Sequence, residues 1–128
     1  MSLLLDTSVL IAGVQHLQEE VGISAISIAE LHFGLLVASD EKRAVRLRRL
    51  AAIESAFDPL PFDADTAREC GHLQAVVVQR GGKARRRAFD LAIAATARVH
   101  GVPLMTFNPA DFKLIEDLVE IRSPGPES

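Results

Sequence analysis

Four acidic residues stand beside hydrophobic segments of this sequence, where they could act together on a metal ion or a phosphate group. They are Asp6, Glu30, Asp90 and Asp111. Asp6 directly follows three leucines at residues 3–5, and such a short apolar run is typical of a strand buried on both faces. Ligands of parallel α/β sheets bind outside the carboxyl ends of the strands. Asp6 is therefore expected where chemistry is usually found, although taken alone an Asp that only turns the chain would fit better.

The elements predicted around Glu30 bring it to the same edge. Residues 22–26 are predicted as a second strand, and Ser27 with Glu30 matches a capping box, with Ser at the helix start and Glu three residues later. A helix that follows a parallel strand begins at the carboxyl end of that strand. Glu30 is therefore expected near Asp6, in the first turn of a helix over about residues 28–37.

Asp90 and Asp111 come from the second half of the chain. Residues 89–100 are apolar nearly all round, which predicts a buried helix that ends at Gly101 and carries Asp90 in its first turn. This helix leads into a strand predicted at residues 102–106, so its first turn also lies near the carboxyl edge. Asp111 follows the end of the same strand. Four acids from distant parts of the sequence would thus lie together along the carboxyl edge of the sheet and form an acidic rim.

Each acid also has an ordinary structural explanation. The helix dipole favours acidic residues in first turns, Glu30 could serve only its capping box, and Asp90 could cap a buried helix. Three or four neighbouring carboxylates, however, cannot all stay ionised without a cation. Mg²⁺ or Mn²⁺ suits carboxylate oxygens and keeps positions open for phosphate oxygens.

Strands and helices alternate along the sequence, which predicts an α/β protein. The expected fold is a three-layer α/β/α sandwich with a central, mainly parallel sheet of about four to five strands. Residues 1–122 are expected to form a single domain, and residues 123–128 a flexible tail. The other predicted elements are a helix that starts at Thr7 or Ser8, helices at about residues 39–55 and 63–79, an extended piece at 57–62, a helical turn at 110–115 and a last strand at 118–121.

Composition excludes several classes of protein. A hydrophobic content of 48% with a mean hydropathy of +0.20 is typical of a globular domain. Cys70 is the one cysteine, so no internal disulfide can form, which suits a reducing compartment. The N-terminal residues do not resemble a signal peptide, and no apolar run approaches the ~20 residues of a membrane span. We therefore expect a cytoplasmic protein with no membrane association.

The net charge of −3 does not indicate a nucleic-acid-binding protein, but the basic residues are unevenly placed. Local patches matter more than the sum for a partner that carries phosphates. One group is Arg43, Arg46, Arg48 and Arg49, and the other is Arg80, Lys83, Arg85, Arg86 and Arg87. With no Trp or Tyr and only six Phe, a platform for base stacking is not expected.

Four segments together resemble the PIN-domain ribonucleases, and among them the VapC-type toxins of bacterial toxin–antitoxin modules. They are Leu-Leu-Leu-Asp6-Thr-Ser-Val-Leu-Ile, Ile26-Ser-Ile-Ala-Glu30-Leu, Arg87-Ala-Phe-Asp90-Leu-Ala-Ile-Ala-Ala-Thr96-Ala and Leu104-Met-Thr106-Phe-Asn108-Pro-Ala-Asp111-Phe112. They occur in the family's order and span nearly the whole chain. The resemblance implies a PIN-like fold, a Mg²⁺- or Mn²⁺-dependent endoribonuclease activity on RNA phosphodiester bonds, and a cognate VapB-type antitoxin as partner.

The same resemblance implies roles for individual residues. The catalytic and metal-site positions fall on Asp6, Glu30 and Asp90, with Asp111 favoured as the fourth acid. Asn108 is neutral where many relatives carry an acid or Asn, so it is expected to hold water or substrate. Phe107 stands where many relatives have Arg, so this position is not expected to contact a phosphate of the RNA.

Other polar residues could support this chemistry. Hydroxyl groups of Ser8, Thr7 and Thr106 could orient the carboxylates, although helix capping or a strand-end role explains them equally well. The basic residues just before Asp90 could hold an RNA backbone or simply face solvent. They are Lys83, Arg85, Arg86 and Arg87. Apolar side chains of the helix pair at about residues 28–53 could form an antitoxin groove or a homodimer face, but core packing is the plainer explanation.

Two other functions remain open. A receiver-like signalling domain has a similar length, a parallel sheet and an acidic rim, but Asp6 stands single where that class needs paired acids. A PIN-like domain could also bind RNA or a partner without cutting it. The presence of all four acids favours the nuclease.

Overall fold

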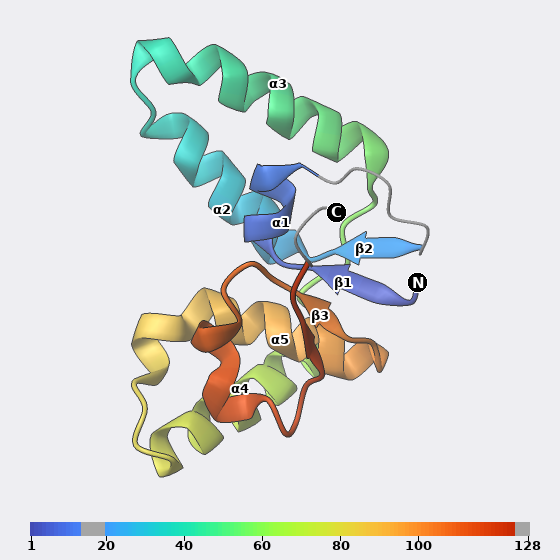
Figure 1. Ribbon diagram of the computed structural model, residues 1–128, viewed down its shortest axis with the longest axis vertical. Helices are drawn as coiled ribbons and strands as arrows, with labels where there is room; N and C mark the ends of the chain where they lie inside the picture. The colour runs from blue at the N-terminus through green and yellow to red at the C-terminus, as the bar shows by residue number, and fades with distance from the viewer. Residues whose placement is uncertain (14–19, 125–128) are drawn as a thin grey trace.

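The computed structural model describes residues 1–13 and 20–124, and this part of the chain contains a four-stranded sheet (Figure 1). Its strand order is β2-β1-β3-β4, and all neighbouring strands are parallel. The strands are β1 (Leu3–Leu5), β2 (Val21–Ile23), β3 (Leu104–Met105) and β4 (Ile121–Arg122). The helices are α1 (Thr7–Ala12), α2 (Ala25–Leu36), α3 (Asp40–Ala56), α4 (Ala64–Gln79) and α5 (Ala88–His100), with 3₁₀-helices η1 (Ala84–Arg87) and η2 (Pro109–Ile115).

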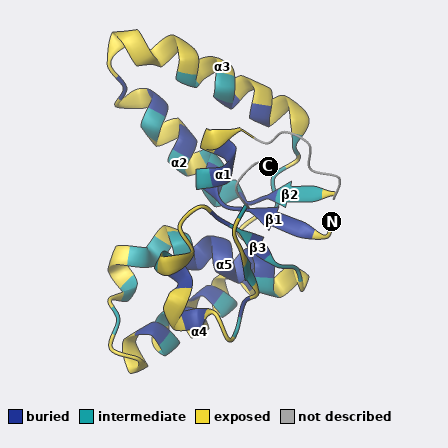
Figure 2. Cartoon of the chain, in the orientation of Figure 1, coloured by how far each residue is buried: buried dark blue, intermediate teal, exposed yellow. Residues whose placement is uncertain are grey.

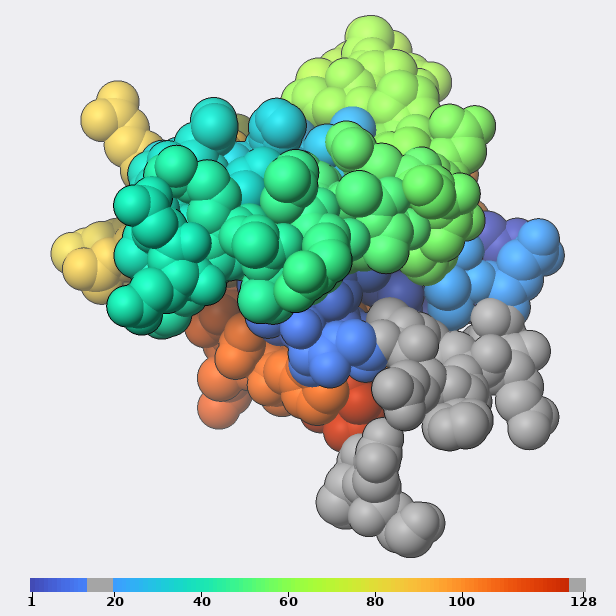
Figure 3. Space-filling model, turned by 90° about the horizontal axis from the view of Figure 1, so that it is seen from above, coloured from blue at the N-terminus to red at the C-terminus, as the bar shows by residue number. Residues whose placement is uncertain are grey.

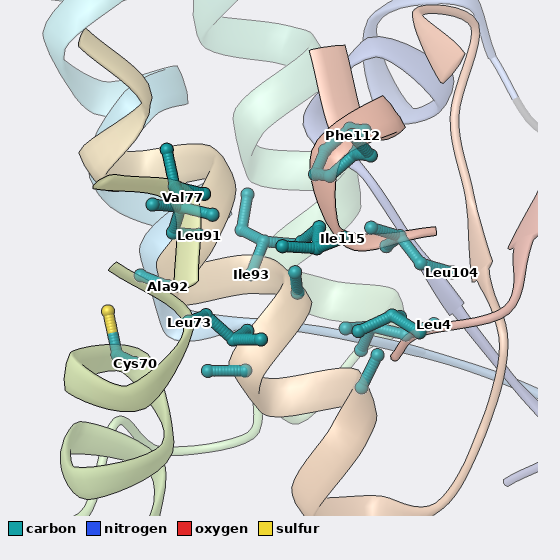
Figure 4. Close-up of a cluster of buried hydrophobic side chains, with 14 residues drawn as sticks. Leu4, Cys70, Leu73, Val77, Leu91, Ala92, Ile93, Leu104, Phe112 and Ile115 are labelled. Carbon is teal, nitrogen blue, oxygen red and sulfur yellow. The ribbon is translucent and has the colours of Figure 1, made fainter. Parts of the chain in front are cut away.

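The three leucines of β1 explain why two hydrophobic cores form. Successive side chains of a strand point to opposite faces. Leu4 packs into a cluster with residues of α4, α5 and η2, part of which Figure 4 shows. Leu3 and Leu5 pack into a second cluster with residues of α1, α2 and α3. One central strand, buried on both faces, thereby fixes the layers above and below it.

The layers confirm the predicted α/β/α sandwich. Helices α1 to α3 lie on one side of the sheet, and α4 and α5 lie on the other (Figure 1). Helix α5 is buried from Leu91 to Ala97, whereas much of α3 is exposed (Figure 2). In the described part of the chain, no helix is long and apolar enough to span a membrane.

The start of α2 differs from the prediction. Strand β2 ends at Ile23, and the side chain of Ser24, not that of Ser27, caps the helix by accepting a hydrogen bond from the backbone N–H of Ile26 at 3.0 Å. The capping box of Ser27 and Glu30 was therefore the wrong interpretation. Glu30 lies in the second turn of α2, which frees its carboxylate from a capping role.

Other ends of helices and strands also differ from the prediction. Asp6, not Thr7 or Ser8, occupies the N-cap position of α1, and its side chain makes no capping hydrogen bond. The last strand is Ile121–Arg122, because the backbone N–H groups of Leu118 and Val119 bond to the carbonyl of Ile115 and continue the η2 turn. The prediction for residues 123–128 falls mostly outside the described residues, which end at 124.

In the second half of the chain, the ends of α4 and α5 agree with the prediction from sequence. The carboxylate of Asp63 caps α4 by accepting a hydrogen bond from the backbone N–H of Thr66 at 3.0 Å. Gly101 ends α5 in the left-handed conformation, with φ of 66°, which a residue with a side chain rarely adopts. The extended piece at 57–62 connects α3 to α4, and Leu60 forms a single bridge with Ser24 beside β2. These ends position the first turn of α5, which carries Asp90.

Candidate active site

Asp6 lies at the carboxyl end of the central strand and is only 5% exposed. Its backbone N–H donates to the carbonyl of Met105 at 2.8 Å, which ties the end of β1 to β3. Ser8 Oγ and Thr106 Oγ1 both donate to Asp6 Oδ2 at 2.8 Å. Two hydrogen bonds to one carboxylate oxygen fix the orientation of the carboxylate.

The two hydroxyl groups are themselves held in place. The backbone N–H of Phe107 donates to Ser8 Oγ, and that of Asn108 donates to Thr106 Oγ1, each at 3.0 Å. Each hydroxyl accepts from the backbone and donates to Asp6, so its single proton has a defined direction. The chain after β3 therefore orients Asp6 through two hydroxyl groups. Asn108 contributes its backbone to this arrangement, and its side chain is exposed.

Glu30 reaches the same region from α2. Thr7 Oγ1 donates to Glu30 Oε1 at 2.7 Å and lies 2.8 Å from Ser27 Oγ. Burial raises the pKa of Glu30, the hydrogen bond from Thr7 lowers it, and the charge of Asp6 raises it again; the net direction is upward. The side chain of Thr7 thus links the first turn of α1 to a carboxylate on α2.

Asp90 has the most strongly perturbed ionisation in the site. Burial is the largest cause, and the charges of Asp6, Asp111 and Glu30 add to it, so that the pKa of Asp90 rises to about 6. Arg87 acts in the opposite direction but is the smallest cause. The other three candidate acids therefore all lie close enough to Asp90 to act on its ionisation. Strongly perturbed carboxylates are concentrated at functional sites.

Arg87 contacts two of the acids, a contact that sequence reasoning missed. Its Nη1 lies 3.0 Å from Asp111 Oδ1 and 3.7 Å from Asp90 Oδ2. The side chain of Arg87 is 41% exposed, so these are rim contacts and not a buried pair in the core. The spacing of three residues between Arg87 and Asp90 within one helical region was the available signal.

The oxygen donors of this rim fit a hard divalent cation. In residues 1–13 and 20–124, however, no three carboxylate, imidazole or thiolate groups are close enough together to form a metal site as they stand. Hydroxyl groups orient Asp6 and Glu30, whereas Arg87 lies 3.0 Å from Asp111 and 3.7 Å from Asp90. A cation bound at this rim would therefore compete with the guanidinium of Arg87. Burial and the neighbouring carboxylates both raise the pKa of Asp90, and a bound cation would favour its ionised form again.

The basic residues before Asp90 surround this rim. Lys83 precedes η1 and the three arginines lie in it, and these residues line two open hollows of about 360 and 240 Å³. Glu30 and Asp90 share the larger hollow with Arg85 and Arg86. Asp111 shares the smaller hollow with Lys83, Arg86 and Arg87. In Figure 3, the yellow-gold side chains of this part of the chain project from the edge of the molecule.

The fold and the site together define a class: a parallel α/β sandwich with acidic side chains gathered at the carboxyl edge of the sheet and basic side chains around them. The sequence profile of the PIN domain matches residues 3–118. The chain therefore belongs to the PIN-domain family, as the four sequence segments indicated.

Individual relatives agree with this assignment. A Rickettsia bellii protein named Ribonuclease VapC is 31% identical over an alignment of 135 residues that covers 97% of this chain and 98% of the relative. A Shigella flexneri protein named tRNA(fMet)-specific endonuclease VapC is 32% identical over 104 residues, covering 79% and 74%. Among solved structures, VapBC-5 of Mycobacterium tuberculosis, a member of the VapBC family of toxin–antitoxin systems, matches with a TM-score of 0.76 and 30% identity over 95% of this chain and 96% of that chain.

Proposed function

We propose that this PIN-domain protein is a metal-dependent endoribonuclease and the toxin of a type II toxin–antitoxin module of the VapBC type. The observation that carries the proposal is the convergence of carboxylates on Asp90: Asp6, Asp111 and Glu30 all lie close enough for their charges to raise its pKa, in addition to the larger effect of burial. The names of the relatives, which include ribonucleases and one tRNA-specific endonuclease, support RNA as the substrate.

Asp6 and Asp90 are the residues proposed to hold Mg²⁺ or Mn²⁺, with Glu30 and Asp111 completing the site. A bound divalent ion supplies a more acidic water and stabilises charge on the phosphoryl oxygens. Ser8 and Thr106 keep Asp6 Oδ2 in a fixed orientation. Thr7 does the same for Glu30 Oε1, so neither carboxylate has to be ordered when the substrate arrives.

The basic residues of η1 are proposed to hold the RNA backbone. Arg85 and Arg86 share the larger hollow with Glu30 and Asp90, so a phosphate near these acids would lie within reach of guanidinium groups. Arg87 is proposed to exchange Asp111 for a phosphate oxygen when the ion and the RNA bind. Lys83, which lines the smaller hollow, extends the positive surface along the same edge.

A VapB-type antitoxin is the proposed protein partner, because the matched structures include VapBC complexes. The helical hairpin of α2 and α3 is a proposed contact surface for the antitoxin or for a second copy of this chain in a homodimer. It exposes Phe33, Leu36, Val37, Val45 and Leu47, and exposed apolar side chains gathered on one surface are typical of protein interfaces. A substrate of cellular RNA and one buried thiol, Cys70, suit a cytoplasmic protein.

Cleavage of single-stranded RNA in Mg²⁺ or Mn²⁺ tests the nuclease. We expect Asp6→Asn and Asp90→Asn each to abolish cleavage, and the exposed Asp58→Asn, far from any described contact with the rim, to retain it. Cleavage that persists in excess chelator would refute the metal dependence. Binding of RNA without cleavage by the wild-type protein would instead identify a non-catalytic PIN domain.

Growth tests the toxin role separately. Induction of the chain alone is expected to arrest a bacterial host, and co-expression of the antitoxin encoded beside it is expected to restore growth. Asp90→Asn serves as the matched control, because it should accumulate to the same level without arresting growth. Undiminished growth with folded wild-type protein would contradict the toxin role but not the nuclease activity.

A further inference from the structure

A large aromatic side chain is exposed beside the carboxylates of the candidate site. Phe89 is 54% exposed, although it lies in the first turn of α5, whose following turns are buried from Leu91 to Ala97. Asp90 is the next residue in the chain. Because the ring of Phe89 remains in contact with water, packing in the core does not account for its position.

The surroundings of Phe89 combine three kinds of group. Its ring lines the open hollow of about 360 Å³ together with Glu30, Asp90, Arg85 and Arg86. Ligand-binding hollows usually measure about 300–1,000 Å³, so this one can take a small ligand or one unit of a polymer. An aromatic face, two guanidinium groups and two carboxylates therefore meet in one accessible space.

We propose that Phe89 is the surface on which one base of single-stranded RNA stacks, beside the phosphate held at the acidic rim. The inference rests on the proposed RNA cleavage and adds a residue that positions the substrate. Proteins that bind single strands combine a positive groove with aromatic side chains that stack on bases. Arg85 and Arg86 supply the positive groove, and Phe89 supplies the aromatic face.

The charge pattern around the ring favours a nucleotide over an apolar protein segment. A base brings its own phosphate, which can pair with Arg85 or Arg86, and its flat face matches the ring of Phe89. An apolar peptide would leave those guanidinium groups without an anionic partner. The small number of aromatic residues argued against stacking from composition alone, but a count does not show where a ring lies.

Fluorescence gives a direct test, because the chain has no Trp or Tyr. Phe89→Trp places one fluorophore at the hollow, and Asp6→Asn in the same protein prevents cleavage. We expect a single-stranded RNA decamer to quench this fluorophore saturably, and an RNA duplex to quench it weakly. Val99→Trp is the matched control, because Val99 is exposed in the last turn of the same helix and lies outside the hollow. It should show no saturable quenching.

Kinetics gives the second test. Stacking on one aromatic side chain contributes enough affinity that its loss weakens binding by about five-fold to a hundred-fold. Phe89→Leu is expected to raise the KM for RNA by that factor with little change in kcat, whereas Phe89→Tyr keeps the wild-type KM. The exposed Val99→Ala should also keep it.

The outcomes separate this inference from the proposed function. If the protein cuts RNA but the Phe89→Trp fluorophore is not quenched and Phe89→Leu keeps its KM, the stacking role is refuted and the nuclease stands. Fluorescence that depends on protein concentration without RNA would assign the ring to a contact between copies, which also overturns the inference. If the wild-type chain neither binds nor cuts RNA, the proposed function fails and the stacking role fails with it.

Discussion

Replacing Asp90 by asparagine is expected to stabilise the metal-free protein at neutral pH. The folded state raises the pKa of Asp90 from 3.8 to about 6, mainly by burial and secondly through neighbouring carboxylates. The unfolded chain ionises this group near its ordinary pKa, so the folded state binds the extra proton between about pH 4 and pH 6. Stability therefore falls as the pH rises through this range, and the full cost is present above about pH 6.

The size of the effect follows from the two pKa values. Ionisation of Asp90 is less favourable in the folded state by about 3 kcal/mol, taken as an upper bound. The side chain is only 25% exposed, so screening by solvent removes part of this cost and not all of it. Asparagine has nearly the same shape and carries no charge. Asp90→Asn should therefore raise Tm by several degrees at pH 7.5 in chelator, and by almost nothing at pH 4.

Thermal unfolding of wild type, Asp90→Asn and Asp58→Asn from pH 4 to pH 8 is the appropriate assay. Asp58 is exposed, so its replacement is expected to leave Tm nearly unchanged at every pH. An Asp90→Asn protein that is no more stable than wild type at pH 7.5 would refute the reasoning. It would mean that Arg87 neutralises the rim, and that the carboxylates do not strain the fold in the absence of an ion.

Three further outcomes are expected. Arg87→Met should lower the Kd for Mn²⁺ several-fold, because the guanidinium no longer competes for Asp111. Electron paramagnetic resonance of the free ion measures this Kd, and unchanged or weaker Mn²⁺ binding would contradict the prediction. Thr106→Val should reduce kcat for RNA about ten-fold while the protein stays folded, because Asp6 loses one of its two hydroxyl donors. Full activity would show that the hydroxyl of Ser8 alone is enough to orient Asp6. Ser24→Ala should cost about 1 kcal/mol in urea unfolding, because α2 loses its cap; no loss would show that water replaces the hydroxyl.

The three-layer architecture could be predicted from sequence because its signals are local. Three leucines before Asp6 mark a strand buried on both faces, and Gly101 after an apolar run marks the end of a buried helix. The predicted topology then placed the four acids at one edge of the sheet, although no contact between them could be seen in the sequence. Hydrophobic periodicity and helix-end residues are properties of short segments, so a single sequence contains them in full.

The start of α2 could not be decided locally, because Ser24 and Ser27 both fit a helix cap. Contacts with distant segments decide between them. The backbone N–H of Ala25 donates to Leu60 at 2.9 Å, which ends β2 early and leaves Ser24 at the cap, while Ser27 meets the hydroxyl of Thr7. Neither partner is near α2 in the sequence.

The contact between Arg87 and Asp111 was hidden for a related reason. Arg87 ends a run of basic residues, which predicts a phosphate-binding or solvated segment, and Asp111 is 24 positions further along the chain. Only the folded chain brings η2, which carries Asp111, beside the end of η1, where Arg87 Nη1 lies 3.0 Å from Asp111 Oδ1. Likewise, the pKa of Asp90 depends on distances that spacing along a chain does not contain.

The hydrogen bond between Asp6 and Thr106 joins residues 100 positions apart, near opposite ends of the chain. A ribosome that has just made the N-terminal half of this protein therefore carries an Asp6 with no threonine to orient it and no β3 beside it. Nascent chains are expected to be inactive toward RNA until β3 and Thr106 have been made. The order of synthesis would thus delay RNA cleavage until the second half of the sheet is in place.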